Sequence, residues 1–219
     1  MEWEDKYKEH IAKRGGMEKY VQYKAKSKHV FIDLVEKYCN KDKSSKVLEA
    51  GCGSGAFSTF LAGLGYSVIG IDIDPKILKL AEEMSLTCNK ANKPSFIMKS
   101  ILSLDDFRVD EFNVIFSNGV LEHFLNREII KTLSEQMRIS KYVIFGIPTK
   151  YFDVSELEYG NERLLEFSYW RDLIKKSGGM ILEEKKCHFK PPLEIICDIK
   201  KYFRPYPYKI FVIKKTQKN

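Results

Sequence analysis

Short apolar runs alternate with longer amphipathic segments along most of the chain. Each run is bounded by glycine, proline or polar residues, which predicts buried strands at 47–50, 67–72, 95–98, 112–117 and 142–147. Apolar residues at helical spacing predict helices between them, at 56–64, from Pro75 onward and around 129–137. Alternating strands and helices predict a parallel sheet with right-handed crossovers and helices on both faces.

The N-terminal residues predict a helical segment ahead of the first strand. Phe31, Leu34, Val35 and Tyr38 recur at helical spacing, and Gly15-Gly16 is expected to divide residues 1–40 into two helices. We therefore expect one domain overall, with a helical cover at 1–44 and the main α/β body at 45–219.

After Pro148 the pattern loosens and then resumes. It predicts a helix near 168–176 and strands near 180–187 and 208–214, the last two pairing antiparallel. The expected fold is a Rossmann-like three-layer α/β sandwich, in which a mostly parallel seven-stranded sheet has an antiparallel last strand.

Composition narrows the class of protein. The 219 residues have an ordinary apolar content of 44%, and the N-terminus begins with charged residues. The apolar runs are too short to span a bilayer, and the five scattered cysteines form no CxxC pair. We expect a cytoplasmic protein with free thiols, no transmembrane segment and no metal site.

The net charge of +7 is concentrated near the C-terminus. Residues 185–219 hold ten Lys/Arg against Glu194 and Asp198. Such a stretch suits an anionic substrate, RNA or a membrane surface, although a solvated strand end is the commoner explanation.

A glycine cluster after the first predicted strand indicates a nucleotide site. Gly51-x-Gly53-x-x-Ala56 fits the dinucleotide fingerprint, and Asp72 lies 21 residues after Gly51, near the spacing of a ribose-binding carboxylate. However, Glu49 precedes the glycines, and no Lys or Arg occurs between Val47 and Tyr66. Acidic surroundings favour a cationic, phosphate-free nucleoside such as S-adenosylmethionine over NAD.

Three motifs carry a resemblance to class I S-adenosylmethionine-dependent methyltransferases. They are Val47-Leu-Glu-Ala-Gly-Cys-Gly-Ser-Gly55, Gly70-Ile-Asp72-Ile-Asp-Pro75 and Asn118-Gly-Val-Leu-Glu-His123. The resemblance runs from about residue 45 to 150 and is closest to the branch that includes quinone-biosynthesis and other small-molecule enzymes. It implies S-adenosylmethionine as cofactor and S-adenosylhomocysteine as product.

The resemblance also implies roles for individual residues. Glu49 and the backbone of Gly51, Cys52 and Gly53 would hold the methionine portion. Apart from the resemblance, we expect the Cys52 side chain to be a small apolar filler, because the local sequence offers no base for a nucleophile. Asp72 would bind the ribose diol, Ile73 would flank adenine, and the backbone of Asn118 would approach the donor amine. Ser100 stands where the family usually has Asp beside the adenine amino group, and Ile101 would supply the neighbouring amide.

Methyl transfer from a sulfonium is an in-line displacement, so the protein contributes mainly by positioning. A hydroxyl or carbon acceptor would need a base, whereas a neutral amine would not. His123, at the carboxyl end of the fourth strand with Glu122 beside it, is the predicted base. The alternatives are a structural histidine that caps the next helix and a Glu122 that interacts with that helix's dipole.

Acceptor recognition is expected from segments outside the resemblance. Tyr151, Trp170 and Arg204 are the predicted contacts, and packing onto the sheet is the alternative for each. The acceptor is expected to be a small molecule, and no Asn-Pro-Pro-Tyr-type tetrapeptide follows the fourth strand. Three other functions stay open: an RNA or protein methyltransferase that uses the basic C-terminal region, an NAD-dependent oxidoreductase, and a cofactor-binding protein without catalysis. The sequence leaves the oligomeric state undetermined.

Overall fold

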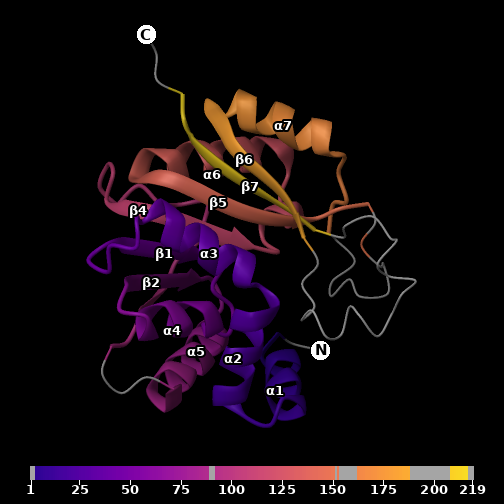
Figure 1. Ribbon diagram of the computed structural model, residues 1–219. Helices are drawn as coiled ribbons and strands as arrows, with labels where there is room; N and C mark the ends of the chain where they lie inside the picture. The colour runs from indigo at the N-terminus through magenta and orange to yellow at the C-terminus, as the bar shows by residue number, and fades with distance from the viewer. Residues whose placement is uncertain (1–2, 89–91, 151, 153–161, 188–207, 217–219) are drawn as a thin grey trace.

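The strands of the computed structural model, which describes residues 3–88, 92–150, 152, 162–187 and 208–216, form one sheet of order β3-β2-β1-β4-β5-β7-β6 (Figure 1). Their bounds are β1 (Lys46–Ala50), β2 (Ser67–Asp72), β3 (Ser95–Met98), β4 (Phe112–Asn118), β5 (Ser140–Pro148), β6 (Gly179–Cys187) and β7 (Tyr208–Lys215). β7 pairs antiparallel with β5 and with β6, while β1 to β5 pair in parallel. The predicted mostly parallel sheet with an antiparallel last strand is confirmed.

Helices cover both faces of this sheet. Their bounds are α1 (Trp3–Lys13), α2 (Met17–Ser27), α3 (His29–Tyr38), α4 (Ala56–Gly63), α5 (Pro75–Cys88), the short 3-10 helix η1 (Leu121–His123), α6 (Asn126–Ile139) and α7 (Phe167–Lys176). α3 and α4 pack on one face and α6 and α7 on the other, while α1 and α2 lie beside α5 (Figure 1). The three predicted layers are therefore present.

The core has two halves because the central strands are buried on both sides. On β1, Val47 joins the cluster under α3 and α4, and the next residue, Leu48, joins the cluster under α6 and α7. Ile144 and Phe145 of β5 divide in the same way. Successive strand residues point to opposite faces, so a doubly covered sheet needs near-continuous apolar runs like these.

The N-terminal region contains three helices where the sequence predicts two. The predicted break at Gly15-Gly16 is confirmed, and both glycines have positive φ. A second break lies at Lys28, between α2 and α3, without a glycine or proline to signal it. α3 shares a core cluster with β1 and β4, so it belongs to the sandwich itself. The domain boundary at residue 44 stays a prediction.

The sheet order places a ligand site between β1 and β4. The chain runs outward from β1 to β3 and then returns to β4 on the other side of β1. In open α/β sheets, ligands bind at the carboxyl ends of the two strands where the order reverses. The glycine turn follows β1 and η1 follows β4, so both motifs meet at this edge. None of the described helices is long and apolar enough to cross a membrane.

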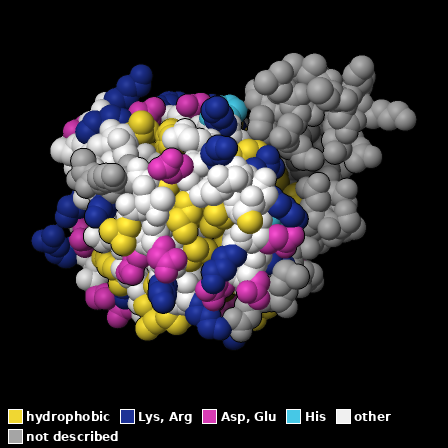
Figure 2. All heavy atoms as spheres, turned by 90° about the horizontal axis from the view of Figure 1, so that it is seen from below, with side chains coloured by type: hydrophobic (Ala, Val, Ile, Leu, Met, Phe, Trp, Pro, Cys, Tyr) yellow, Lys and Arg dark blue, Asp and Glu magenta, His cyan; other side chains and the backbone are white. Residues whose placement is uncertain are grey.

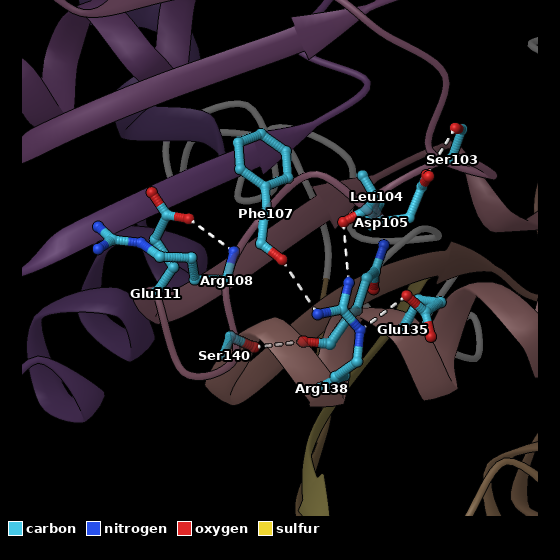
Figure 3. A network of polar contacts seen from close by, with 10 residues as sticks. Ser103, Leu104, Asp105, Phe107, Arg108, Glu111, Glu135, Arg138 and Ser140 are labelled. Carbon is cyan, nitrogen blue, oxygen red and sulfur yellow. Dashed lines mark hydrogen bonds and ion pairs between the residues drawn. The ribbon is translucent and has the colours of Figure 1, made fainter.

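An arginine of α6 holds the loop between β3 and β4 in place (Figure 3). The Arg138 guanidinium donates to the backbone carbonyls of Leu104, at 2.9 Å, and Phe107, at 3.0 Å. It also pairs with Glu135 on its own helix at 2.9 Å. A planar guanidinium can fill several acceptors at once, so one side chain fixes this loop.

Candidate functional site

The glycine turn after β1 is a tight left-handed segment. The N–H groups of Gly51 and Cys52 both donate to the carbonyl of Ile71 at 2.9 Å, and the φ values of Gly51 and Gly53 are +75° and +50°. A β-carbon at Gly51 would lie 2.6 Å from Val120, and one at Gly53 would collide with the Tyr7 hydroxyl. Only glycine fits both positions.

Glu49 lies behind the turn and is almost fully buried. Its Oε2 accepts hydrogen bonds from the Ser58 backbone N–H, at 2.9 Å, and from the Ser58 hydroxyl, at 2.6 Å. Burial raises the pKa of Glu49 to about 8 despite these bonds. The Glu49 carboxyl is therefore easier to protonate than an exposed acid, and a cation bound beside it would favour its ionised form.

Asp72 closes the other side of the turn from the end of β2. One carboxylate oxygen accepts the Gly53 N–H at 3.0 Å, and the other accepts the Asp74 N–H at 3.2 Å. A carboxylate has about four lone-pair sites, so two remain for hydroxyl groups. The next residue, Ile73, is 69% exposed at the surface expected for adenine.

The segment after β3 comes close to Asp72. The Lys99 N–H donates to the Asp72 carbonyl at 2.9 Å, and the Ser100 hydroxyl accepts the Leu102 N–H at 3.2 Å. Ile101 is buried in the core. The structure thus places Ser100 and Ile101 beside the end of β2, and their adenine contacts stay predictions.

Cys52 is buried within the turn. Burial raises the pKa of its thiol well above the usual range. A neutral, enclosed thiol is a weak nucleophile, so its environment fits a packing role.

A cavity of about 140 Å³ opens at the carboxyl end of β4. Its lining comes from α1, α2 and the break after α2, from η1, from the ends of β4 and β5 and the segments that follow them, and from the start of β7. The lining residues are Tyr7, His10, Lys24, Lys28, Asn118, Gly119, Glu122, His123, Pro148, Phe152, Glu162 and Tyr208. The cavity therefore brings together the predicted donor contact Asn118 and the predicted base His123.

Glu122 is the most buried acid of this cavity. Only 2% of the residue is exposed, and its Oε2 has no hydrogen-bond partner among the residues that the structure describes. Burial raises the pKa of Glu122 to about 8. The interpretation as a helix-start charge does not fit, because Glu128 fills that place: its carboxylate accepts the Leu125 N–H at the start of α6 at 2.8 Å.

The three predicted acceptor contacts have different outcomes in the structure. Trp170 is fully buried and packs against Phe145 with ring centroids 6.0 Å apart, which corrects its interpretation as an acceptor contact. Tyr151 and Arg204 lie outside the described residues. Phe152, the neighbour of Tyr151, lines the cavity and meets Tyr208 edge-on at 5.1 Å.

Four cavity residues from the N-terminal region were not predicted from the sequence. Tyr7 and His10 of α1, Lys24 of α2 and Lys28 at the α2–α3 break all line the cavity. In the sequence these residues look like ordinary polar positions on the surface of a helix. Only the fold shows which of them lie at the end of β4. The break at Lys28 had no residue signal.

Comparison with protein families matches residues 41–164 to a methyltransferase domain family. An uncharacterized methyltransferase of Schizosaccharomyces pombe is 30% identical over 96 residues, covering 44% of this chain and 34% of the relative. A ubiquinone biosynthesis O-methyltransferase of Thiobacillus denitrificans is 33% identical over 81 residues, covering 36% and 33%. The matched region thus spans about a third of the length of these relatives.

Solved structures share the fold at low sequence identity. Magnesium protoporphyrin IX methyltransferase of Synechocystis, crystallised with bound S-adenosylmethionine, superimposes with a TM-score of 0.64 at 18% identity, covering 91% of this chain and 82% of that one. The [4+2]-cyclase SpnF has a TM-score of 0.66 at 16% identity, covering 86% and 81%. The second example shows that the fold alone does not fix the reaction. Together with the family match over more than half of its length, this likeness places the chain in the methyltransferase domain family, with the class I fold of S-adenosylmethionine-dependent methyltransferases.

Proposed function

We propose that this chain transfers the methyl group of S-adenosylmethionine to a small-molecule acceptor bound at the carboxyl end of β4. The observation that carries the proposal is the glycine turn between Glu49 and Asp72, set where the strand order reverses. No Lys or Arg occurs between Val47 and Tyr66, so the turn suits a phosphate-free nucleoside. Family membership supports the same donor and gives no support to an NAD-dependent oxidoreductase.

The described residues fit the donor. Asp72 keeps free lone pairs for a ribose diol, and the hydrogen bonds of Glu49 all fall on Oε2, which leaves Oε1 for a ligand. Asn118 has a buried Oδ1 without a partner among the described residues. These acceptors suit the amino and hydroxyl donors of S-adenosylmethionine. When bound, S-adenosylmethionine would supply an activated methyl group on its sulfonium. The chain would orient that methyl group and exclude water from it.

The cavity at β4 supports a small acceptor. Its volume is about 140 Å³, and its walls include aromatic rings, lysines and buried oxygens. Figure 2, which shows the molecule from below the view of Figure 1, has acidic and basic side chains mixed around hydrophobic ones on that face. The ubiquinone O-methyltransferase among the relatives acts within a small-molecule pathway by its name.

Protein methylation is the second function, because a ribosomal protein L11 methyltransferase of Campylobacter lari is 28% identical over 154 residues, 68% of this chain. The basic C-terminal region that would serve a protein or RNA substrate falls mostly outside the described residues. Within the described part, Lys209 is 2% exposed and pairs with Glu184, so it is not available to a polyanion.

Two measurements test the proposal. Calorimetry of the whole chain should give micromolar binding of S-adenosylhomocysteine and none of NAD at millimolar concentration. Binding of NAD alone contradicts the donor. Methyl-tritiated S-adenosylmethionine, incubated with the protein and a cell extract, should then give a labelled small-molecule product that chromatography separates from the donor and that does not form without the protein. Label confined to precipitated protein or RNA contradicts the small acceptor.

A further inference from the structure

Residues that line the cavity at β4 carry buried oxygens without a hydrogen-bond partner among the described residues. Glu122 Oε2 and Asn118 Oδ1 come from η1 and from the last residue of β4. A buried acceptor left without a donor has lost its hydration and gained nothing in return, so each such atom in a native protein calls for an explanation. A ligand with hydrogen-bond donors would satisfy both, which points to bound chemistry at this end of the strand.

The carboxyl of Glu122 differs from that of an exposed glutamate because it changes its protonation state near neutral pH. Burial is the main cause of its raised pKa, Glu162 adds to it, and Lys28 opposes it. The other titratable groups that face the cavity come from α1, α2, η1 and β7. They are Tyr7, His10, Lys24, His123 and Tyr208. A carboxyl that gains and loses a proton near neutrality is what proton transfer to and from a substrate requires.

We propose that Glu122 is the general base of the reaction and accepts the proton of a hydroxyl group on the methyl acceptor. The inference rests on the proposed methyltransferase function and deepens it by naming the acceptor class. A neutral amine attacks without a base, whereas a hydroxyl must lose its proton as it attacks. A dedicated base in the cavity therefore indicates a hydroxyl or a carbon acid rather than a neutral amine, and the hydroxyl is the acceptor class that we propose.

The step balances without another reactant. The acceptor oxygen forms a bond to the methyl carbon while the carbon–sulfur bond breaks, and that electron pair stays on sulfur. The hydroxyl proton moves to ionised Glu122 at Oε2, which has no hydrogen-bond partner within the described part of the chain. Glu122 then releases the proton to water, and the products are the methyl ether, S-adenosylhomocysteine and one proton.

Sinefungin provides a test that needs no acceptor, because it carries an ammonium where the donor carries the methyl-bearing sulfonium. If Glu122 faces the reacting centre, the wild type should bind sinefungin about tenfold to a hundredfold more tightly than S-adenosylhomocysteine at pH 8, the range of a charge-assisted hydrogen bond. The advantage should shrink at pH 6, where Glu122 is protonated. This pH dependence is measured on the wild type and needs no variant.

The variants Glu122→Gln and His123→Gln form a matched pair. Glu122→Gln should lose the sinefungin advantage and keep its affinity for S-adenosylhomocysteine within about threefold, while His123→Gln should keep both. Equal losses for both ligands in Glu122→Gln, or loss of the advantage in His123→Gln alone, overturn the inference. A wild type that binds S-adenosylhomocysteine with no preference for sinefungin also overturns it. A wild type that binds neither ligand removes the proposed function itself.

Discussion

The substitution Glu49→Gln tests whether the carboxyl behind the glycine turn is neutral in the folded protein. Glutamine keeps an oxygen that can accept both hydrogen bonds of Ser58 and removes the ionisation. Burial raises the pKa of Glu49 to about 8 in the folded chain. In the unfolded chain a glutamate has a pKa of about 4.3.

The magnitude follows from the width of the pH interval. Between the two pKa values the unfolded chain has released the proton and the folded chain still holds it, so stability falls as pH rises. The loss is about 1.4 kcal/mol for each pH unit. The interval from pH 5 to 7 lies between the two pKa values. The ionisation of Glu49 therefore lowers the free energy of unfolding of the wild type by about 3 kcal/mol between pH 5 and pH 7. The glutamine variant does not lose this stability, because glutamine has no proton to release.

Urea unfolding followed by circular dichroism at pH 5, 6 and 7 measures the effect as a difference between variant and wild type. Groups common to both proteins, including Glu122, cancel in that difference. We expect the free energy of unfolding of the variant, relative to the wild type, to rise by about 3 kcal/mol from pH 5 to pH 7. For a chain of this size that corresponds to about 6–12 °C in Tm. The exposed control Glu82→Gln should show no such trend. A difference that stays constant with pH refutes a neutral Glu49.

Three further predictions concern other parts of the molecule. Asp72→Asn should weaken S-adenosylhomocysteine binding at least tenfold in calorimetry through lost charge-assisted bonds to the ribose; unchanged affinity would show that the diol lies elsewhere. Arg138→Met should lower the free energy of unfolding by about 1–3 kcal/mol, because the carbonyls of Leu104 and Phe107 lose their donor; a wild-type urea midpoint would contradict the role of this side chain. For Glu184, the Arg171 hydrogen bond is the main cause that lowers the pKa to about 2, so its contribution is complete above about pH 4.3 and disappears as pH falls toward 2. Glu184→Gln should therefore destabilise the protein at pH 6 and much less at pH 2.5, and equal destabilisation at both pH values would argue against the ion pair.

Strands and helices of the body could be predicted from sequence because burial imposes simple periods. Val47 and Leu48 serve opposite faces of one sheet, so the run had to be apolar throughout. The glycine turn was equally readable, because φ values of +75° and +50° admit little else at Gly51 and Gly53.

Other features depend on tertiary placement and left no local signal. Glu49 and Glu122 look like ordinary acids in the sequence, and only their enclosure by other elements shifts their charge. Trp170 sits on an amphipathic helix, where an aromatic residue suits a ligand cover or a core equally well. The cavity lysines lie on α2 and at the break after it, and their position depends on how α2 packs against α4 and α5.

A crystal structure with bound S-adenosylhomocysteine tests the central claim most directly. We expect the ribose hydroxyls within hydrogen-bond distance of Asp72, the amino acid portion along Gly51 to Gly53, and the sulfur directed toward Glu122. A nucleoside bound elsewhere, or a diphosphate on the turn amides, would contradict the assignment of this turn to the methyl donor.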